Sequence, residues 1–326
     1  MSKHKATARA HPNIALIKYW GNLDNILRLP ANSSLSFALG ALETQTTVQF
    51  DDQLPADQVV IDDVPASDSA SLRVHLHLDR IRHLANIETC AYVESSSNFP
   101  AGAGIASSAS AFAALTLAAC SACNLQLDSR SLSRLARQGS GSASRSIFGG
   151  FAIWHAGKTD AESYAESIAE KDHWPIVDLI TIVNLSHKTV GSSEGHLRAE
   201  TSPLQPTRVA DTPRRLEICR QAIMDRDFST LASIVELDSN MMHAVMMTSK
   251  PPLLYWSAAT IEIMKTVSRL RQEGLDICYT IDAGPNVHCI CMREHVKDAY
   301  DTLKKIPGVV DILESAPGDG AVLLDR

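Results

Sequence analysis

The chain has 326 residues, of which 45% are hydrophobic and 21% charged, so its composition is that of an ordinary globular protein. A chain of this length usually has more than one hydrophobic core, and two lobes are therefore expected. The formal net charge of −7 argues against non-specific nucleic-acid binding and against attachment to an anionic membrane.

The sequence shows no signal for export or for membrane insertion. No apolar run approaches the roughly 20 residues that span a bilayer. The N-terminal residues 1–5 carry a little positive charge, but no apolar segment follows them. We therefore expect a cytoplasmic protein. The seven cysteines argue against a disulfide framework because their number is odd, and Cys120 and Cys123 are expected to be small buried thiols within a helix.

Strand and helix patterns are mixed along the first half of the chain. β-branched content and apolar alternation predict strands, and apolar periodicity predicts helices, one of which is capped by Asp128. The strands are predicted at 33–39, 46–50, 59–61, 91–99, 151–154 and 176–184, and the helices at 72–84, 110–122 and 129–138.

The second half is richer in helical patterns. Residues 202–212 contain Pro203 and Pro206 and precede Pro213, so a loop is predicted there. Since the strands of the chain do not strictly alternate with helices, the fold class is α+β. Helices are predicted at 214–224, 228–247, 256–272 and 294–305, and strands at 277–281, 288–292, 309–313 and 321–324.

A Gly/Ala/Ser-rich loop at 100–109 joins the strand at 91–99 to the helix at 110–122. Gly102 and Gly104 allow the backbone to turn tightly around an anion. Ser107 and Ser108 lie where the helix begins, with free N–H groups at the positive end of its dipole. The loop has neither the Walker nor the dinucleotide-binding spacing. It is predicted to bind phosphate, and the alternative is a strand-to-helix turn with a serine cap.

Further segments resemble the mevalonate diphosphate decarboxylase family. This family is part of the GHMP kinase superfamily, whose other members include galactokinase, homoserine kinase and mevalonate kinase. The resemblance runs from about residue 8 to the C-terminus, with the motifs in the order of that family. The segments are HPNIALIKYWG at 11–21, GSGSASRSIFGG at 139–150, DSNMMHA at 238–244 with the prolines at 251 and 252, and TIDAGPN at 280–286.

The resemblance implies two α+β lobes, placed here at 1–190 and 191–326, with the active site in the cleft between them. It also implies ATP and Mg²⁺ as cofactors, phosphorylated mevalonate as substrate, and a homodimer. Phosphoryl transfer to the tertiary C3 hydroxyl makes that group a good leaving group, and the C3–O bond then breaks as CO2 departs. The product is isopentenyl phosphate or isopentenyl diphosphate, in isoprenoid biosynthesis by the mevalonate pathway.

Three charged residues are the catalytic candidates. By resemblance Asp282 is a general base or orienting carboxylate, and the alternative is an Asx-turn aspartate. Lys18 is implied to place its ammonium on the substrate or the C3 oxygen, unless its stem only covers the aromatic residues that follow it. Arg145 lies in a Gly/Ser-rich loop. By resemblance its guanidinium binds the substrate carboxylate that is lost as CO2, and the alternative is an arginine on a surface loop.

The remaining candidates bind substrate or nucleotide, and no protein residue is assigned as a metal ligand. Arg73 is aligned with a family arginine near the terminal phosphate. Asn240 and His243, three residues apart on one helical face, are expected to be hydrogen-bonded core groups. The substrate-binding candidates are Asn13, Tyr19, Ser140, Ser142, Ser192 and Ser193, and those for the ATP phosphates are Gly102, Gly104, Ser107 and Ser108.

Two positions depart from the family pattern. Asn22 stands where most members have a lysine near the diphosphate, and Glu194 stands where some have a basic residue. A charge-assisted contact is worth about 1.5–3 kcal/mol, so the monophosphate rivals the diphosphate as substrate. A GHMP kinase that stops after phosphorylation and a non-enzymatic binding protein are the alternatives. Decarboxylation is favoured over both because Asp282, Lys18 and Arg145 are all present.

Overall fold

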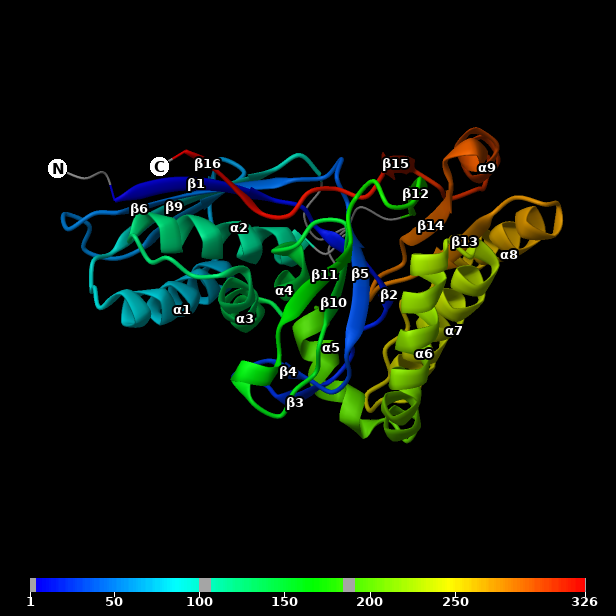
Figure 1. Ribbon diagram of the computed structural model, residues 1–326, viewed down its shortest axis with the longest axis horizontal. Coiled ribbons are helices and arrows are strands. Elements are labelled where there is room, and N and C mark those ends of the chain that lie inside the picture. Colours follow the sequence, from blue (N-terminus) through cyan, green and yellow to red (C-terminus); the bar gives the residue numbers. More distant parts are fainter. Residues whose placement is uncertain (1–3, 100–106, 184–190, 326) are drawn as a thin grey trace.

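The computed structural model describes residues 4–99, 107–183 and 191–325. Its largest sheet has the strand order β16-β1-β6-β9-β7-β8, in which β7 and β9 run parallel and the other pairs are antiparallel. Strand β16 near the C-terminus lies beside β1 near the N-terminus (Figure 1). The strands are β1 (Lys5–Ala10), β6 (Thr44–Phe50), β7 (Gln58–Ile61), β8 (Val64–Pro65), β9 (Ala91–Ser97) and β16 (Val322–Asp325).

Helices cover one face of this first sheet (Figure 1). The alanine-rich helix α2 packs on β1 and β6, where its buried Ala113, Ala114 and Ala118 allow the helix to lie close to the strands. Asp128 caps α3 as predicted, since its side chain accepts a hydrogen bond from the backbone N–H of Ser131 at 2.7 Å. The helices are α1 (Asp68–Ala85), α2 (Ser107–Ala122), α3 (Ser129–Gly139) and α4 (Ala143–Ser146).

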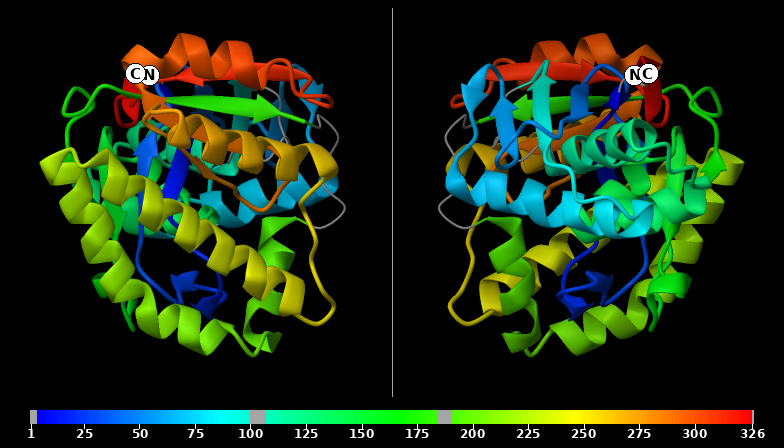
Figure 2. Two further views of the ribbon diagram at one scale, coloured as in Figure 1. Left: turned by 90° about the vertical axis from the view of Figure 1, so that its right-hand side faces the viewer. Right: turned by 90° about the vertical axis from the view of Figure 1, so that its left-hand side faces the viewer.

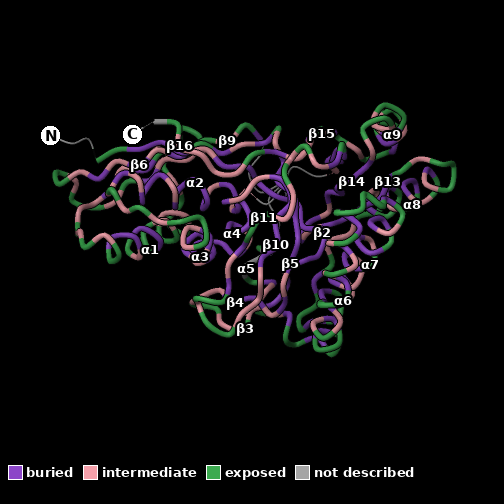
Figure 3. Tube along the Cα trace, in the orientation of Figure 1, coloured by how far each residue is buried: buried purple, intermediate pink, exposed green. Residues whose placement is uncertain are grey.

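A second sheet, in the order β11-β10-β5-β2, passes through the middle of the molecule. Every residue of β2, β5 and β10 is buried, and Figure 3 shows these strands in the colour of buried residues. A short hairpin of β3 and β4 extends from the end of β2. The strands are β2 (Asn13–Ile17), β3 (Asn22–Asp24), β4 (Leu29–Pro30), β5 (Ser34–Ala38), β10 (Phe151–Trp154) and β11 (Ala165–Ala169).

The third sheet, β13-β14-β12-β15, belongs to the second half of the chain. Helices α8 and α9 pack on one of its faces, and α7 packs on the other. The left view of Figure 2 faces this half, with α9 at the top and α8 across the middle. The elements are β12 (Ile176–Ile182), α5 (Ser192–Arg198), α6 (Gln205–Asp225), α7 (Phe228–Thr248), α8 (Ala258–Gln272), β13 (Ile277–Thr280), β14 (Val287–Met292), α9 (Val296–Leu303) and β15 (Asp311–Ser315), with short 3₁₀ turns at Asp160–Glu162, Ala199–Thr201 and Arg293–His295.

The loop predicted at 202–212 is wrong, because α6 already begins at Gln205. Pro206 lies in the first turn, where a missing N–H breaks no helical hydrogen bond. Pro213 lies inside the helix and does remove one. The helix nevertheless continues because it buries Arg208 and Thr212 in a tertiary network, and such packing outweighs local propensity.

The mixture of helices and strands fits the predicted α+β class. The lobe boundary near residue 190 stays a prediction. No helix in the described part of the chain combines the length and the apolar character that a membrane span requires.

Candidate active site

One pocket is lined by residues from both halves of the chain. Two of the candidates, Gly102 and Gly104, lie outside the described residues, and Ser192 and Ser193 begin α5 with side chains that are not described. The sequence candidates that line this pocket are Asn13, Lys18, Tyr19, Ser108, Ser140, Ser142, Arg145 and Asp282.

Lys18 and Asp282 form an ion pair in this pocket, with 2.5 Å between Nζ and Oδ1. Lys18 follows the end of β2 and Asp282 follows the end of β13 closely, so two strand ends bring together residues 264 positions apart. The lysine side chain is 1% exposed and that of the aspartate 25%. The ammonium therefore forms an ion pair with this carboxylate, and the side chain does not merely lie over aromatic surface.

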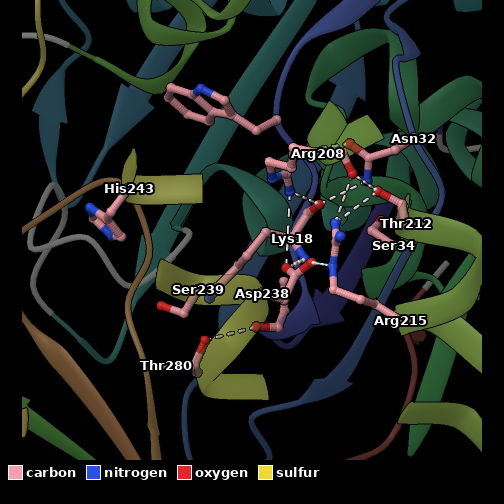
Figure 4. Close-up of polar contacts among 12 residues, drawn as sticks. Lys18, Asn32, Ser34, Arg208, Thr212, Arg215, Asp238, Ser239, His243 and Thr280 are labelled. Atoms are coloured by element: carbon pink, nitrogen blue, oxygen red, sulfur yellow. Dashed lines mark hydrogen bonds and ion pairs between the residues drawn. The ribbon is translucent and has the colours of Figure 1, made fainter. Parts of the chain in front are cut away.

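The backbone of Lys18 is fixed on both sides (Figure 4). Its N–H donates to Oδ2 of Asp238 at 2.6 Å. Its carbonyl accepts hydrogen bonds from Asn32 Nδ2 at 2.9 Å and from an Arg208 terminal nitrogen at 2.8 Å. Asp238 in turn pairs with Arg215, 2.8 Å between Nε and Oδ1, and both side chains are fully buried. This network holds Lys18 in place from α6 and α7.

The sequence analysis gave no role to Asp238, Arg208 or Arg215. A signal was present, because Arg208, Thr212 and Arg215 recur at helical spacing on what proves to be a buried face of α6. The loop prediction at 202–212 hid this signal. Charged side chains are seldom fully buried unless they are paired with an opposite charge.

Arg145 is 3% exposed, and its described hydrogen-bond partners are all neutral. Its Nε donates to Oγ of Ser36 at 2.9 Å and to Oδ1 of Asn13 at 3.1 Å, and a terminal nitrogen donates to Ser34. Burial lowers the pKa of Arg145 to about 10, an effect that the nearby carboxylate of Asp282 opposes. The guanidinium therefore stays charged at neutral pH.

Aromatic rings form another wall of the pocket. The Tyr19 ring stacks on the imidazole of His196 at 4.1 Å and meets Trp154 edge-on at 4.6 Å. A Cβ at Gly141 would lie 2.6 Å from the Tyr19 ring, so glycine is required for this approach. Burial raises the pKa of Tyr19, which keeps its hydroxyl protonated and able to donate to Oδ1 of Asn22. The sequence analysis did not single out His196.

A second pocket lies beside the first, between the first sheet and helices α1 and α2. Ser107 and Ser108, the first residues of α2, line it, and Ser108 and Arg73 line both pockets. The hydroxyl oxygens of Ser108 and Ser140 are 3.0 Å apart, which connects the helix to the Gly/Ser-rich loop. The two pockets therefore adjoin at the N-terminus of α2.

Asn240 and His243 lie outside the first pocket, as predicted. Asn240 Nδ2 donates to the Tyr279 hydroxyl oxygen at 2.9 Å, and His243 Nε2 lies 3.3 Å from the carbonyl oxygen of Ile281. Both are core polar groups with hydrogen-bond partners.

Comparison with known proteins identifies the family. Residues 10–165 match the diphosphomevalonate decarboxylase-like N-terminal domain, and residues 178–317 match the mevalonate 5-diphosphate decarboxylase C-terminal domain. A diphosphomevalonate decarboxylase of Ganoderma lucidum is 38% identical over 94% of this chain and 82% of its own length. The chain belongs to the diphosphomevalonate decarboxylase family.

Solved structures of this family have the same fold. The mevalonate diphosphate decarboxylase of Staphylococcus aureus superimposes with a TM-score of 0.94, at 36% identity and over 98% of each chain. A complex of MDDEF with MVAPP, AMPPCP and magnesium superimposes with a TM-score of 0.93, at 36% identity and over 99% of each chain. These likenesses confirm the predicted α+β, GHMP kinase-like fold.

Proposed function

We propose that this pocket carries out the ATP-dependent decarboxylation of a 5-phosphorylated mevalonate, and that the monophosphate is handled at least as well as the diphosphate. ATP-dependent decarboxylation is the activity of the family to which the chain belongs, and ATP and Mg²⁺ are its cofactors. The observation that carries the assignment is the Lys18–Asp282 pair in a pocket that also holds the buried Arg145. Roles of individual residues are part of the proposal.

Asp282 is proposed to orient the C3 hydroxyl and to accept its proton as the phosphoryl group arrives. Asp282 passes this proton on to solvent and, as a carboxylate again, favours the positive charge that develops at C3 when the C3–O bond breaks. Lys18, which is paired with Asp282, is proposed to present its ammonium to the C3 oxygen. Arg145, held by three neutral partners, is proposed to bind the substrate carboxylate until it leaves as CO2.

Ser107 and Ser108 are proposed to hold the ATP phosphates at the start of α2, because the first N–H groups of a helix have no partner within the helix and its dipole favours anions there. ATP supplies the phosphoryl group that turns the C3 hydroxyl into a leaving group. In the described residues, no three His, Cys, Asp or Glu side chains are grouped to hold a metal ion. Mg²⁺ keeps several waters, and it is proposed to bind here through the phosphates of ATP.

Asn22 carries the proposal about the substrate tail. Its Oδ1 accepts from the Tyr19 hydroxyl and its Nδ2 donates to Asn25 at 2.9 Å, so both polar atoms are used near the hairpin. Glu194 pairs with Arg198 on α5, so its negative charge is compensated and contributes less than the sequence suggested. Without the family lysine at residue 22, a second phosphate gains one charge-assisted contact fewer.

The test supplies mevalonate 5-phosphate and mevalonate 5-diphosphate separately with Mg-ATP and measures CO2 and ADP. We expect one CO2 per ADP, and kcat/KM for the monophosphate equal to or above that for the diphosphate. ADP without CO2 would identify a kinase and contradict the decarboxylation. A strong preference for the diphosphate would contradict only the monophosphate proposal.

A homodimer, a cytoplasmic location and a lobe boundary near residue 190 are also proposed, on the family resemblance. Light scattering tests the dimer, cell fractionation tests the location, and limited proteolysis tests the boundary. A monodisperse monomer at micromolar concentration would contradict the dimer.

A further inference from the structure

The β3–β4 hairpin directs one arginine toward the substrate pocket. Arg28 lies at the end of its turn, immediately before β4, and lines the same pocket as Lys18 and Asp282. Its backbone is in the left-handed region, with φ at 50°. A non-glycine residue rarely adopts this region unless its surroundings hold it there.

The hairpin is fastened so that the position of Arg28 is well defined. Asp24 Oδ1 accepts the backbone N–H groups of Ile26 and Leu27, each at 2.8 Å. Arg137 Nε donates to the Leu27 carbonyl at 3.0 Å, and Arg28 Nε donates to the Gln138 carbonyl at 3.1 Å. This last contact uses one N–H of the guanidinium, and within the described part of the chain its two terminal nitrogens have no partner.

The charge of Arg28 has no counter-ion in the described residues, and the same is true of Arg73. Arg73 donates to the Gly139 carbonyl at 3.3 Å and lies over the Phe112 ring, both neutral contacts. Burial lowers the pKa of Arg73, and the positive charge of Arg28 lowers it further. Two arginines without carboxylates on one pocket wall form an environment that an anion stabilises.

His196 adds a neutral donor to this wall. Its Nδ1 accepts the backbone N–H of Gly21 at 3.0 Å, so the proton of the neutral ring is on Nε2. Burial lowers the pKa of His196 to about 3, and the charges of Arg28 and Arg208 act in the same direction. The ring is therefore neutral at physiological pH, and it lines the pocket together with Arg28.

We propose that Arg28 binds the 5-phosphate of the substrate, with the Nε2–H of His196 as a second donor. The terminal nitrogens of a guanidinium match two phosphate oxygens, which an ammonium does only as a point charge. The assignment rests on the proposed function, because it takes the substrate to be a 5-phosphorylated mevalonate.

The first test is Arg28→Gln, which removes the charge and keeps an unbranched side chain. The KM for mevalonate 5-phosphate should rise by about 10- to 150-fold, with kcat and the KM for ATP little changed. The matched control is Arg226→Gln, because Arg226 also has a left-handed backbone, φ 58°, and is exposed at the end of α6. An unchanged KM in Arg28→Gln, or an equal rise in the KM for ATP, overturns the proposal.

Arg28→Lys is the second variant, and it decides the question if the glutamine variant does not fold. It keeps the charge and loses the planar fork, so the KM should rise by roughly three- to tenfold. A KM equal to that of the wild type contradicts phosphate binding by the guanidinium fork.

Inorganic phosphate separates this proposal from the proposed function. Phosphate should raise the melting temperature of the wild type and of Arg226→Gln more than that of Arg28→Gln. If the wild type releases no CO2 from either substrate but phosphate still distinguishes these variants, the proposed function fails and the Arg28 site stands. Equal stabilisation of all three proteins overturns the Arg28 site.

Discussion

The two ends of the substrate pocket hold their charges in opposite ways. At the reaction end, Lys18 is paired with Asp282, and its backbone is anchored by Asp238, which is itself paired with Arg215. At the end proposed for the substrate tail, Arg28 and its neighbour Arg73 have no carboxylate partner among the described residues, and each donates a hydrogen bond to a backbone carbonyl.

This difference shows which part of the site is complete before substrate arrives. Breaking a buried ion pair leaves an uncompensated charge, so changes at the reaction end should damage both chemistry and folding. Removing an unpaired cation leaves no orphaned partner, so changes at the tail end should cost affinity alone.

Asp282→Asn should have the largest effect, because it removes the carboxylate of the reaction end. General acid–base groups contribute about 10²- to 10⁴-fold, and we expect CO2 release to fall by that factor. ATP affinity, measured by titration, should stay within a few-fold because the second pocket is untouched. Asp172→Asn, at an exposed loop position, is the control. Near-wild-type turnover in folded Asp282→Asn would contradict the assignment.

Asp238→Asn should destabilise the fold as well as the site. The change removes the fully buried carboxylate of Arg215 and leaves only its pair with the part-exposed Asp211, which should lower the free energy of unfolding by about 3–5 kcal/mol in urea denaturation. Asp211→Asn is the matched control, since Asp211 also pairs with Arg215 but is 31% exposed, and about 1 kcal/mol or less is expected there. Equal losses in the two variants would show that the Lys18 anchor is not special.

Asn22→Lys should make the tail end resemble that of most family members. One added cation near the phosphates should raise the ratio of kcat/KM for diphosphate over monophosphate about tenfold. Ile26→Lys adds the same charge at a side chain of the hairpin that is 79% exposed and should leave the ratio unchanged. If the ratio is the same before and after Asn22→Lys, other cations set the choice of substrate.

His77 lies away from the pocket and tests the pH dependence of the fold alone. It is fully buried, and burial lowers its pKa from 6.5 to about 3. Between these two pH values the unfolded chain binds a proton at His77 and the folded chain does not. The free energy of unfolding therefore falls as the pH falls from 6.5, and His77 contributes no further loss below about pH 3.

The expected effect of His77 is about 1.4 kcal/mol per pH unit within that window. Urea denaturation at pH 7 and pH 5 should show a smaller acid-induced loss in His77→Gln than in the wild type. An equal pH slope in both proteins would mean that His77 is protonated in the folded state.

Much of the fold and part of the site could be predicted because the signals are local. The alanine-rich pattern predicted α2, the Asp128 cap predicted the start of α3, and buried alternation predicted β14. Lys18 and Asp282 each stand within a short continuous motif at a strand end, so the sequence singled them out without any knowledge of their contact.

Sequence patterns therefore predicted most of the elements, though not the start of α6, and the family, and they singled out Lys18 and Asp282 as candidates. Only the tertiary structure decided how that end is anchored and what surrounds the substrate tail. Asp238 meets Lys18 from 220 positions away, and His196 meets Gly21 from 175. Arg28 points into the pocket because its hairpin is fastened to Gln138 and Arg137, 110 positions along the chain. Periodicity and spacing describe neighbours along the chain, whereas burial and charge pairing depend on which distant segments pack together.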